Sequence, residues 1–360
     1  MQVARIWRVY LMSEMTDNFG PIPIDAFQGT NPDFASVQEV YYYMLSELDA
    51  AQEALDLEVS VPANTQGLDP AYGFDFGKWK KYANSMRMRL AMRLSEVDPD
   101  KAREEFEDAV AIGYIETMDD AFAVQEQPGW DPLSGVMSRS WNAQFLSATL
   151  NNLYIGLGGI STEEQLPASY HQYVKPEDYI GVRYLDHFTT TTNDPSAGYW
   201  MDGLQAEIDP RAYEAVAVPG DVSKPGFVGG TATKRRLLND NSELLDSIQA
   251  AFTWNASALG SWGDKGAKNE LYASSSSIPI MVREFRTSES TRIFFGPWES
   301  YFLIAEAAIR GWATGMDGAT AYENGVSASF DYWGLSNFTG TYLASEEYNR
   351  TGTSVSWNHT

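Results

Sequence analysis

Residues 78–112 read KWKKYANSMRMRLAMRLSEVDPDKAREEFEDAVAI, and their pattern sets the expected fold class. Residues 78–97 place apolar side chains at helical spacing on one side. Asp98 and Pro99 then provide a cap and a first turn, because proline is favoured at the first helical position. The second helix is expected to end at Ile112, before a glycine. The apolar side of the first helix consists of Trp79, Tyr82, Ala83, Met86, Leu90 and Leu94.

A second helical hairpin is expected at 297–333. Pro297 starts its first helix, Gly311 closes it, Asp317 caps the next helix, and Gly334 ends it. Both hairpins have about the length of a tetratricopeptide (TPR) unit, whose period is about 34 residues, although the strict repeat consensus is absent. The sequence therefore predicts a mainly α fold with a TPR-like hairpin scaffold.

Two more helices are expected before the first hairpin. Residues 3–15 carry apolar side chains at helical spacing, and residues 36–55 begin with a Ser36–Glu39 capping box. The apolar stripe of the second of these helices consists of Val37, Val40, Tyr41, Met44, Leu48, Ala51 and Leu55.

The middle of the chain, 113–296, is rich in Gly, Pro, Thr, Ser and Asn and has few helical stripes. Short helices are expected at 139–152 and 240–252, and a strand at 278–286. Long loops on a rigid scaffold usually carry function. We therefore expect one domain over 1–360, in which a helical scaffold (1–112 and 297–334) supports a loop-rich, ligand-facing region (113–296).

Composition excludes several functional classes. The 360 residues carry a formal charge of −24, which argues against a nucleic-acid binder or a protein that binds an anionic membrane surface. The chain has no Cys, and no apolar run reaches the roughly 18 residues of a membrane span. We expect no cofactor and no metal, since the metal, nucleotide and triad motifs are absent.

Polar residues on the predicted helices have a structural interpretation. Asn84, Arg87, Arg89 and Arg93 are expected to pair with acidic residues on adjacent helices, and Glu306 with such an arginine. A carboxylate pair could hydrolyse glycosides, but nothing places the adjacent Asp119 and Asp120 in a cleft. No catalytic residue is therefore assigned.

Tryptophans fall into two groups. Trp7, Trp79, Trp298 and Trp333 lie on helical stripes and are expected in the core. Others lie in the irregular middle beside polar residues, where a flat ring can stack on a sugar; the alternative is that each pins a loop to the scaffold. The candidate ligand-binding residues are Trp130, Trp141, Tyr199, Trp200, Asp202, Trp254 and Trp262.

The order of several segments resembles the SusD/RagB family. Those segments are Asn18–Pro23 (NFGPIP), Ser36–Leu55, Trp79–Arg93 (WKKYANSMRMRLAMR), Asp209–Arg211 (DPR), Glu299–Trp312 (ESYFLIAEAAIRGW) and Tyr322–Trp333 (YENGVSASFDYW). The resemblance implies a non-catalytic surface lipoprotein of the outer membrane of Bacteroidetes, acting in nutrient uptake. It implies two partners: a SusC-like TonB-dependent transporter and an oligosaccharide or polysaccharide ligand.

The ends of the chain add one expectation. Residues 3–15 are already helical in pattern, with neither a targeting region nor a cap before them, and the family's lipoprotein signal and C-terminal stretch have no counterpart. We therefore expect a fragment truncated at both ends, whose contact with the membrane would run only through a lipid anchor absent from this chain. Two other functions stay open: a glycoside hydrolase of helical architecture and a TPR-like peptide-binding module.

Overall fold

The structure is a computed structural model in which the chain forms two compact units. The first unit consists of Met1–Gln125, Thr291–Tyr332 and Trp357–Thr360; the second consists of Glu126–Ser290 and Trp333–Ser356. The residues that the structure describes are 1–25, 32–127, 146–171, 174, 204–217, 234–238, 244–249, 271–272, 280–285 and 290–357.

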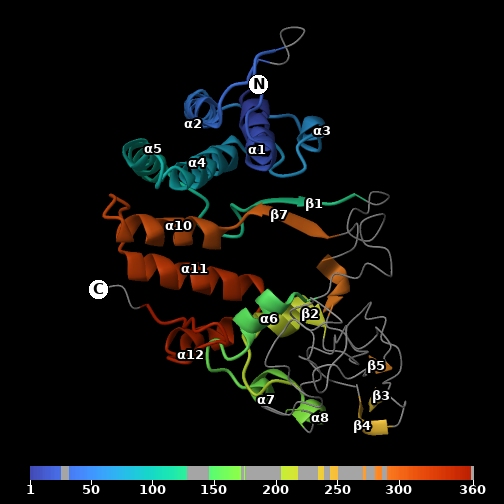
Figure 1. The fold of residues 1–360 in the computed structure, drawn as a ribbon. Helices are drawn as coiled ribbons and strands as arrows, with labels where there is room; N and C mark the ends of the chain where they lie inside the picture. The colour runs from blue at the N-terminus through green and yellow to red at the C-terminus, as the bar shows by residue number, and fades with distance from the viewer. Residues whose placement is uncertain are drawn as a thin grey trace. The chain divides into compact units, whose positions relative to one another are not determined.

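Long antiparallel helices build the N-terminal part of the first unit (Figure 1). They are α1 (Gln2–Phe19), α2 (Val37–Glu53), α4 (Phe76–Arg93) and α5 (Pro99–Ile112), with the short α3 (Ala63–Gln66) beside them. Their shared core is fully buried and contains Ile6, Val9, Met44, Leu48, Tyr82 and Leu90. The predicted mainly α scaffold is confirmed.

The capping signals act as predicted. Ser36 and Glu39 form a capping box at the start of α2, and the side chain of Asp98 accepts from the Lys101 N–H at the start of α5. The predicted end of the first hairpin helix was wrong: α4 stops at Arg93. After it, the N–H of Leu94 donates to the Ala91 carbonyl, which tightens the last turn into i→i+3 bonds.

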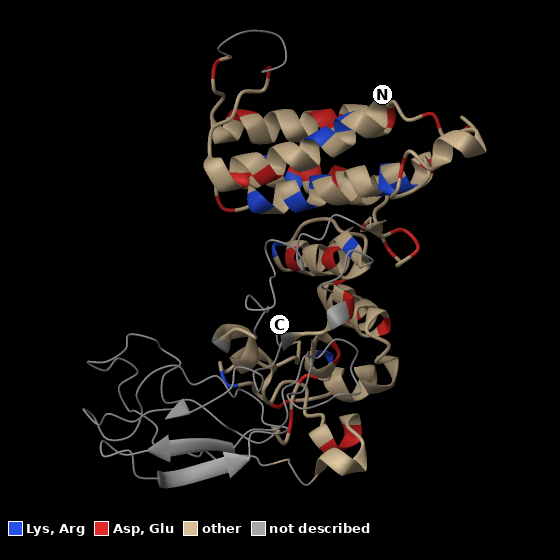
Figure 2. Cartoon of the chain, turned by 90° about the vertical axis from the view of Figure 1, so that its right-hand side faces the viewer, with Lys and Arg blue, Asp and Glu red and all other residues tan. Residues whose placement is uncertain are grey.

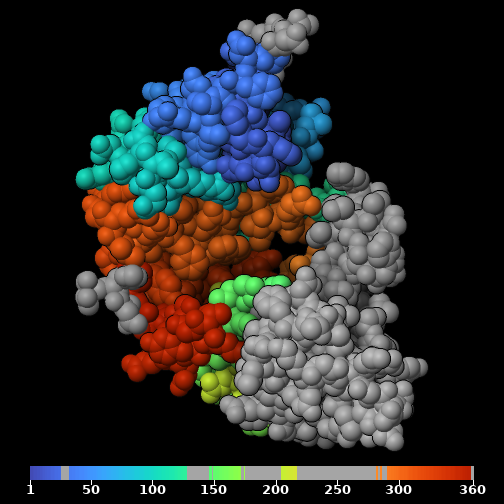
Figure 3. All heavy atoms as spheres, viewed as in Figure 1, coloured from blue at the N-terminus to red at the C-terminus, as the bar shows by residue number. Residues whose placement is uncertain are grey.

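The second hairpin lies in the same unit and consists of α10 (Pro297–Ile309) and α11 (Gly318–Tyr332). Asp317 Oδ1 accepts from the Thr320 N–H at 3.0 Å, so the predicted cap is present. The helices approach closely at Gly325, where an added Cβ would lie 2.7 Å from the ring of Phe302. In Figure 3 these helices form one continuous packed surface with α4 and α5.

A two-stranded antiparallel sheet completes the first unit. Strand β1 (Phe122–Gln125) pairs with β7 (Thr291–Phe295). The Phe122 ring stacks on Tyr82 of α4, with centroids 4.0 Å apart and planes at 13°. This stack joins the sheet to the helical core.

The tryptophans expected in the core are buried or half-buried: Trp7, Trp79, Trp298 and Trp333.

Arginines of α4 tie the helices of the first unit together, as predicted. The guanidinium of Arg87 is 3% exposed and lies 3.0 Å from Asp49 of α2, and 2.8 and 2.9 Å from Glu105 and Asp108 of α5. Arg89 bonds Glu299 of α10 at 2.5 Å. Figure 2 shows acidic and basic residues interspersed along these helices.

Two polar residues differ from the expectation. Glu306 pairs with Arg310, one turn along its own helix and on the surface, rather than with an arginine of α4. Asn84 is fully buried but donates only to the carbonyl of Lys80 in its own helix, at 3.1 Å, among the contacts of the described residues. Neither residue bridges two helices.

The second unit contains short elements. Its helices are α6 (Ala148–Tyr154), α7 (Thr162–Gln165), α8 (Ala168–His171), α9 (Arg211–Ala215) and α12 (Thr339–Leu343), with 3₁₀ turns at Arg283–Phe285 and Ser336–Phe338. Strand β2 (Val216–Ala217) pairs with β6 (Ile280–Met281). Strand β3 (Lys234–Leu238) lies between β4 (Leu244–Gln249) and β5 (Leu271–Tyr272).

In the second unit, the structure contradicts one element expected from the sequence and agrees in part with two others. The predicted helix at 240–252 is wrong, because Leu244–Gln249 is a strand paired with β3; strand pairing overrides a weak local helical preference. Of the expected helix at 139–152, residues 146–152 are described, and the helix begins at residue 148. The expected strand at 278–286 is a strand at Ile280–Met281 followed by a 3₁₀ turn.

Candidate ligand-binding site

The ligand-binding residues predicted from the sequence all lie outside the described residues, and so they stay predictions: Trp130, Trp141, Tyr199, Trp200, Asp202, Trp254 and Trp262. The described segment 204–217 begins two positions after Asp202 in the chain. Leu204 is fully buried in the core of the second unit.

A buried ion pair anchors segment 204–217. Asp209 is 1% exposed and accepts from Arg211 Nε at 2.9 Å and from the Tyr342 hydroxyl, also at 2.9 Å. Arg211 Nη2 in turn donates to the Tyr342 hydroxyl at 2.7 Å. We call Asp209, Arg211 and Tyr342 the clamp. It closes a network of charge-assisted hydrogen bonds between residues more than 130 positions apart.

The clamp also requires a glycine. Gly158 has a φ of +89°, and an added Cβ there would lie 2.2 Å from the ring of Tyr342. Only glycine adopts this backbone without strain and leaves the room that the ring occupies. The clamp therefore fixes the loop around Gly158, segment 204–217 and α12 against one another.

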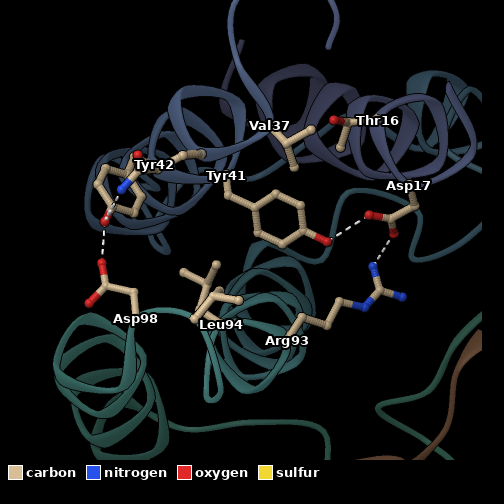
Figure 4. A pocket seen from close by; sticks show the side chains of 10 residues that line it. Thr16, Asp17, Val37, Tyr41, Tyr42, Arg93, Leu94 and Asp98 are labelled. Atoms are coloured by element: carbon tan, nitrogen blue, oxygen red, sulfur yellow. Dashed lines mark hydrogen bonds and ion pairs between the residues drawn. The ribbon is translucent and has the colours of Figure 1, made fainter. Parts of the chain in front are cut away.

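The first unit holds a pocket of about 590 Å³ between α1, α2 and the turn that joins α4 to α5 (Figure 4). Pockets of this size commonly bind small molecules. Sequence analysis did not identify this site, because its residues come from three segments that share no local motif. The side chains that define its chemistry are Asp17, Gln38, Tyr41, Tyr42, Arg93 and Asp98.

Polar groups lie at both ends of the pocket. At one end, Asp17 accepts from the Tyr41 hydroxyl at 2.6 Å and pairs with Arg93. At the other end, the Tyr42 hydroxyl donates to Asp98 (Figure 4). These bonds orient both tyrosines and both carboxylates before any ligand arrives. Burial of Tyr41, together with its bond to Asp17, raises the pKa of its hydroxyl above the ordinary value of 10.0.

Aliphatic side chains form the middle of the pocket. Val37 of α2 is 41% exposed and Val97 of the turn is 78% exposed, while Leu94, on the side of the pocket facing Val37, is buried (Figure 4). Val37 was expected on the buried stripe of its helix; it lies instead at the pocket rim. The pocket thus combines an apolar centre with hydrogen-bonding ends, which suits a ligand that has both apolar faces and hydroxyl groups.

The carboxylates considered for hydrolysis have structural partners. Asp120 accepts from Lys81 at 2.9 Å and from Thr117 at 3.1 Å, and Asp119 pairs with Lys78. Burial alone would raise the pKa of Asp120, but its bond and charge interaction with Lys81 outweigh that effect and lower the pKa. A general acid needs the opposite shift.

The described residues contain no group of three or more His, Cys, Asp and Glu side chains that could hold a metal ion. They also contain no helix that is both long enough and apolar enough to span a membrane.

The chain was compared with protein-family models and with curated proteins. A family model described as "SusD-like: Susd and RagB outer membrane lipoprotein" matches residues 1–193 and 261–358. The match leaves out 194–260, which include four of the predicted ligand-binding residues and Asp209–Arg211 of the clamp. No curated protein matches the chain.

Solved structures with the same fold include a SusD homolog from Parabacteroides distasonis, with 25% identity and a TM-score of 0.69. Another from Bacteroides thetaiotaomicron has 20% identity and a TM-score of 0.63. A chitin-binding SusD homolog from Flavobacterium johnsoniae has 21% identity and a TM-score of 0.56. They cover 98%, 99% and 99% of this chain, whereas the chain spans 60%, 59% and 61% of theirs.

Proposed function

Because the chain belongs to the SusD-like family of outer-membrane lipoproteins, we propose that it is a non-catalytic glycan-binding receptor at the cell surface. In this role it passes oligosaccharides to a SusC-like TonB-dependent transporter. The observation that carries the proposal is the family match over residues 1–193 and 261–358. One structural relative is a chitin-binding SusD homolog, which favours a glycan as the ligand.

Ligand contacts are proposed to come from the aromatic residues of the middle region. Tyr199, Trp200, Asp202 and Trp254 fall within 194–260, the stretch that the family model does not match. Residues outside the shared family pattern are where a choice between glycans would be encoded, since specificity requires contacts that favour one ligand over another. We propose that this stretch selects the glycan and that the clamp anchors it a few positions after Asp202.

The glycan receptor can be tested by affinity electrophoresis against soluble polysaccharides. We expect the purified chain to be retarded by at least one polysaccharide, and Trp200→Ala or Trp262→Ala to abolish the retardation. Each substitution removes an aromatic ring on which a sugar can stack, worth about 1–3 kcal/mol by analogy with nucleobases that stack on aromatic side chains. Tyr348→Ala is the matched control, since Tyr348 is an exposed aromatic residue (61%) of the same unit.

Retention of binding by both tryptophan variants would refute the choice of contact residues. Equal loss in Tyr348→Ala would show that the effect is not specific to them. Circular dichroism of each variant verifies that the helical content is unchanged.

A further inference from the structure

The pocket of the first unit has no role in the proposal above, and its chemistry is that of a sugar-binding site. Pyranose rings present C–H faces and hydroxyl groups that both donate and accept hydrogen bonds. Val37, Leu94 and Val97 offer apolar surface, and Asp17 and Asp98 offer acceptor oxygens. Arg93 offers donors, since the guanidinium has five N–H groups. The Gln38 amide has two N–H groups, and it already donates to the Tyr42 hydroxyl at 3.0 Å, which leaves one for a ligand.

Preorganisation distinguishes this pocket from an ordinary surface hollow. Asp17 is held by Tyr41 and Arg93, and Asp98 accepts from both the Tyr42 hydroxyl and the Lys101 N–H. Each carboxylate has about four lone-pair positions, so these bonds leave acceptor capacity for a ligand. Groups fixed in advance lose little conformational entropy on binding, which favours affinity for a small ligand.

The charge of the pocket and of the whole chain favours neutral sugars over anionic ones. The pocket contains two carboxylates and one guanidinium, and that guanidinium is already paired with Asp17. The whole chain carries a formal charge of −24. A uronate or a sulfated sugar would meet like charge both locally and at long range, whereas a neutral sugar would not.

We propose that this pocket is a subsite for neutral pyranose units of a glycan, a second contact region besides the loop residues of the second unit. This inference rests on the proposed glycan-receptor function and names a ligand class for a site on the helical scaffold. Neutral oligosaccharides bind here through their hydroxyls to Asp17, Arg93 and Asp98, with the valines against their C–H faces.

The test fills the pocket without disturbing the core. Val97→Trp and Val37→Trp place a large ring at exposed rim positions (78% and 41% exposed). Val59→Trp makes the same change at a site that is 50% exposed and lies outside the pocket. Isothermal titration calorimetry measures the binding of neutral gluco-, manno-, xylo- and chito-oligosaccharides and of anionic oligogalacturonate.

We expect the unaltered chain to bind a neutral oligosaccharide better than oligogalacturonate. Val97→Trp and Val37→Trp should weaken that binding by about tenfold or more, with an unchanged melting temperature, whereas Val59→Trp should bind normally. Normal binding by both rim variants would overturn the subsite and leave the receptor function standing, provided the unaltered chain binds glycan.

Three other results would also overturn the subsite. Equal affinity for oligogalacturonate would contradict its selectivity. Binding of a basic, apolar peptide that is lost only in the rim variants would identify the pocket as a peptide groove. Failure of the unaltered chain to bind any glycan would refute the receptor function and the subsite together.

Discussion

Replacing Arg87 with methionine is expected to lower the free energy of unfolding by about 3–5 kcal/mol, the usual cost of removing one partner of a buried ion pair. Arg87 is 3% exposed and faces Asp49, Glu105 and Asp108. Glu105 is the buried partner, with a side chain only 11% exposed, so it carries most of the cost. Urea unfolding followed by circular dichroism measures the change.

Two matched variants isolate the cause. Arg103→Met removes an exposed pair within α5 and should cost less than about 1 kcal/mol. The double variant Arg87→Met/Glu105→Leu should recover most of the loss, because removing both partners of a buried pair leaves no unpaired charge. Equal losses in Arg87→Met and Arg103→Met would show that this cluster does not hold the helices together.

The same cluster predicts how stability depends on pH. Burial raises the pKa of Glu105, but its bonds to Lys101 and Arg87 outweigh burial and hold the pKa below its ordinary value of 4.5. A carboxylate with a lowered folded-state pKa contributes stability above pH 4.5, and that contribution is lost as the pH falls through the lowered value. In Arg87→Met this pKa should rise, so that acid unfolding begins at a higher pH.

Asp209→Ala is expected to destabilise the second unit by a similar amount, about 3–5 kcal/mol, because it removes the buried carboxylate that accepts from Arg211 Nε and Nη2. Tyr342→Phe keeps the ring and removes only the hydroxyl, and should cost about 1–2 kcal/mol. Hydrogen exchange at segment 204–217 reports the loss locally. Unchanged protection in Asp209→Ala would contradict the role of the clamp.

Glycine variants test the packing of the same site. Gly158→Ala should destabilise the second unit, since its Cβ would lie 2.2 Å from the ring of Tyr342 at a φ of +89°. Gly340→Ala in α12 is the control, because nothing lies within 4 Å of its added Cβ. Alanine is the better helix former, so the control should be neutral or stabilising by up to about 1 kcal/mol. The free energy of unfolding should therefore fall in Gly158→Ala and stay the same or rise in Gly340→Ala.

Sequence reasoning predicted the helical hairpins well because their signals are local. The Ser36–Glu39 capping box, the Asp98–Pro99 start and the Asp317 cap each lie within one turn of the helix that they begin. The roles of Arg87 and Arg89 also followed from the sequence, because a cation on a largely apolar helix needs an acidic partner nearby.

Other features depend on residues far apart in the chain, and no local pattern reveals them. The strand at Leu244–Gln249 forms by pairing with β3, so its local sequence was misread as a helix. The pocket combines Asp17, Tyr41 and Asp98 from three segments. Tyr41 matched a helical stripe, and nothing in that stripe indicated that its hydroxyl would meet an aspartate of α1.

The proposed glycan-receptor function is tested most directly by measuring both binding and hydrolysis in the same mixtures. The purified chain is run in gels that contain soluble polysaccharides, and the same mixtures are assayed over time for new reducing ends. A non-catalytic receptor for neutral glycans should be retarded by a neutral polysaccharide and should produce no increase in reducing ends. New reducing ends from the pure protein would contradict it and identify a hydrolase, and a folded protein that no glycan retards would contradict the glycan receptor itself.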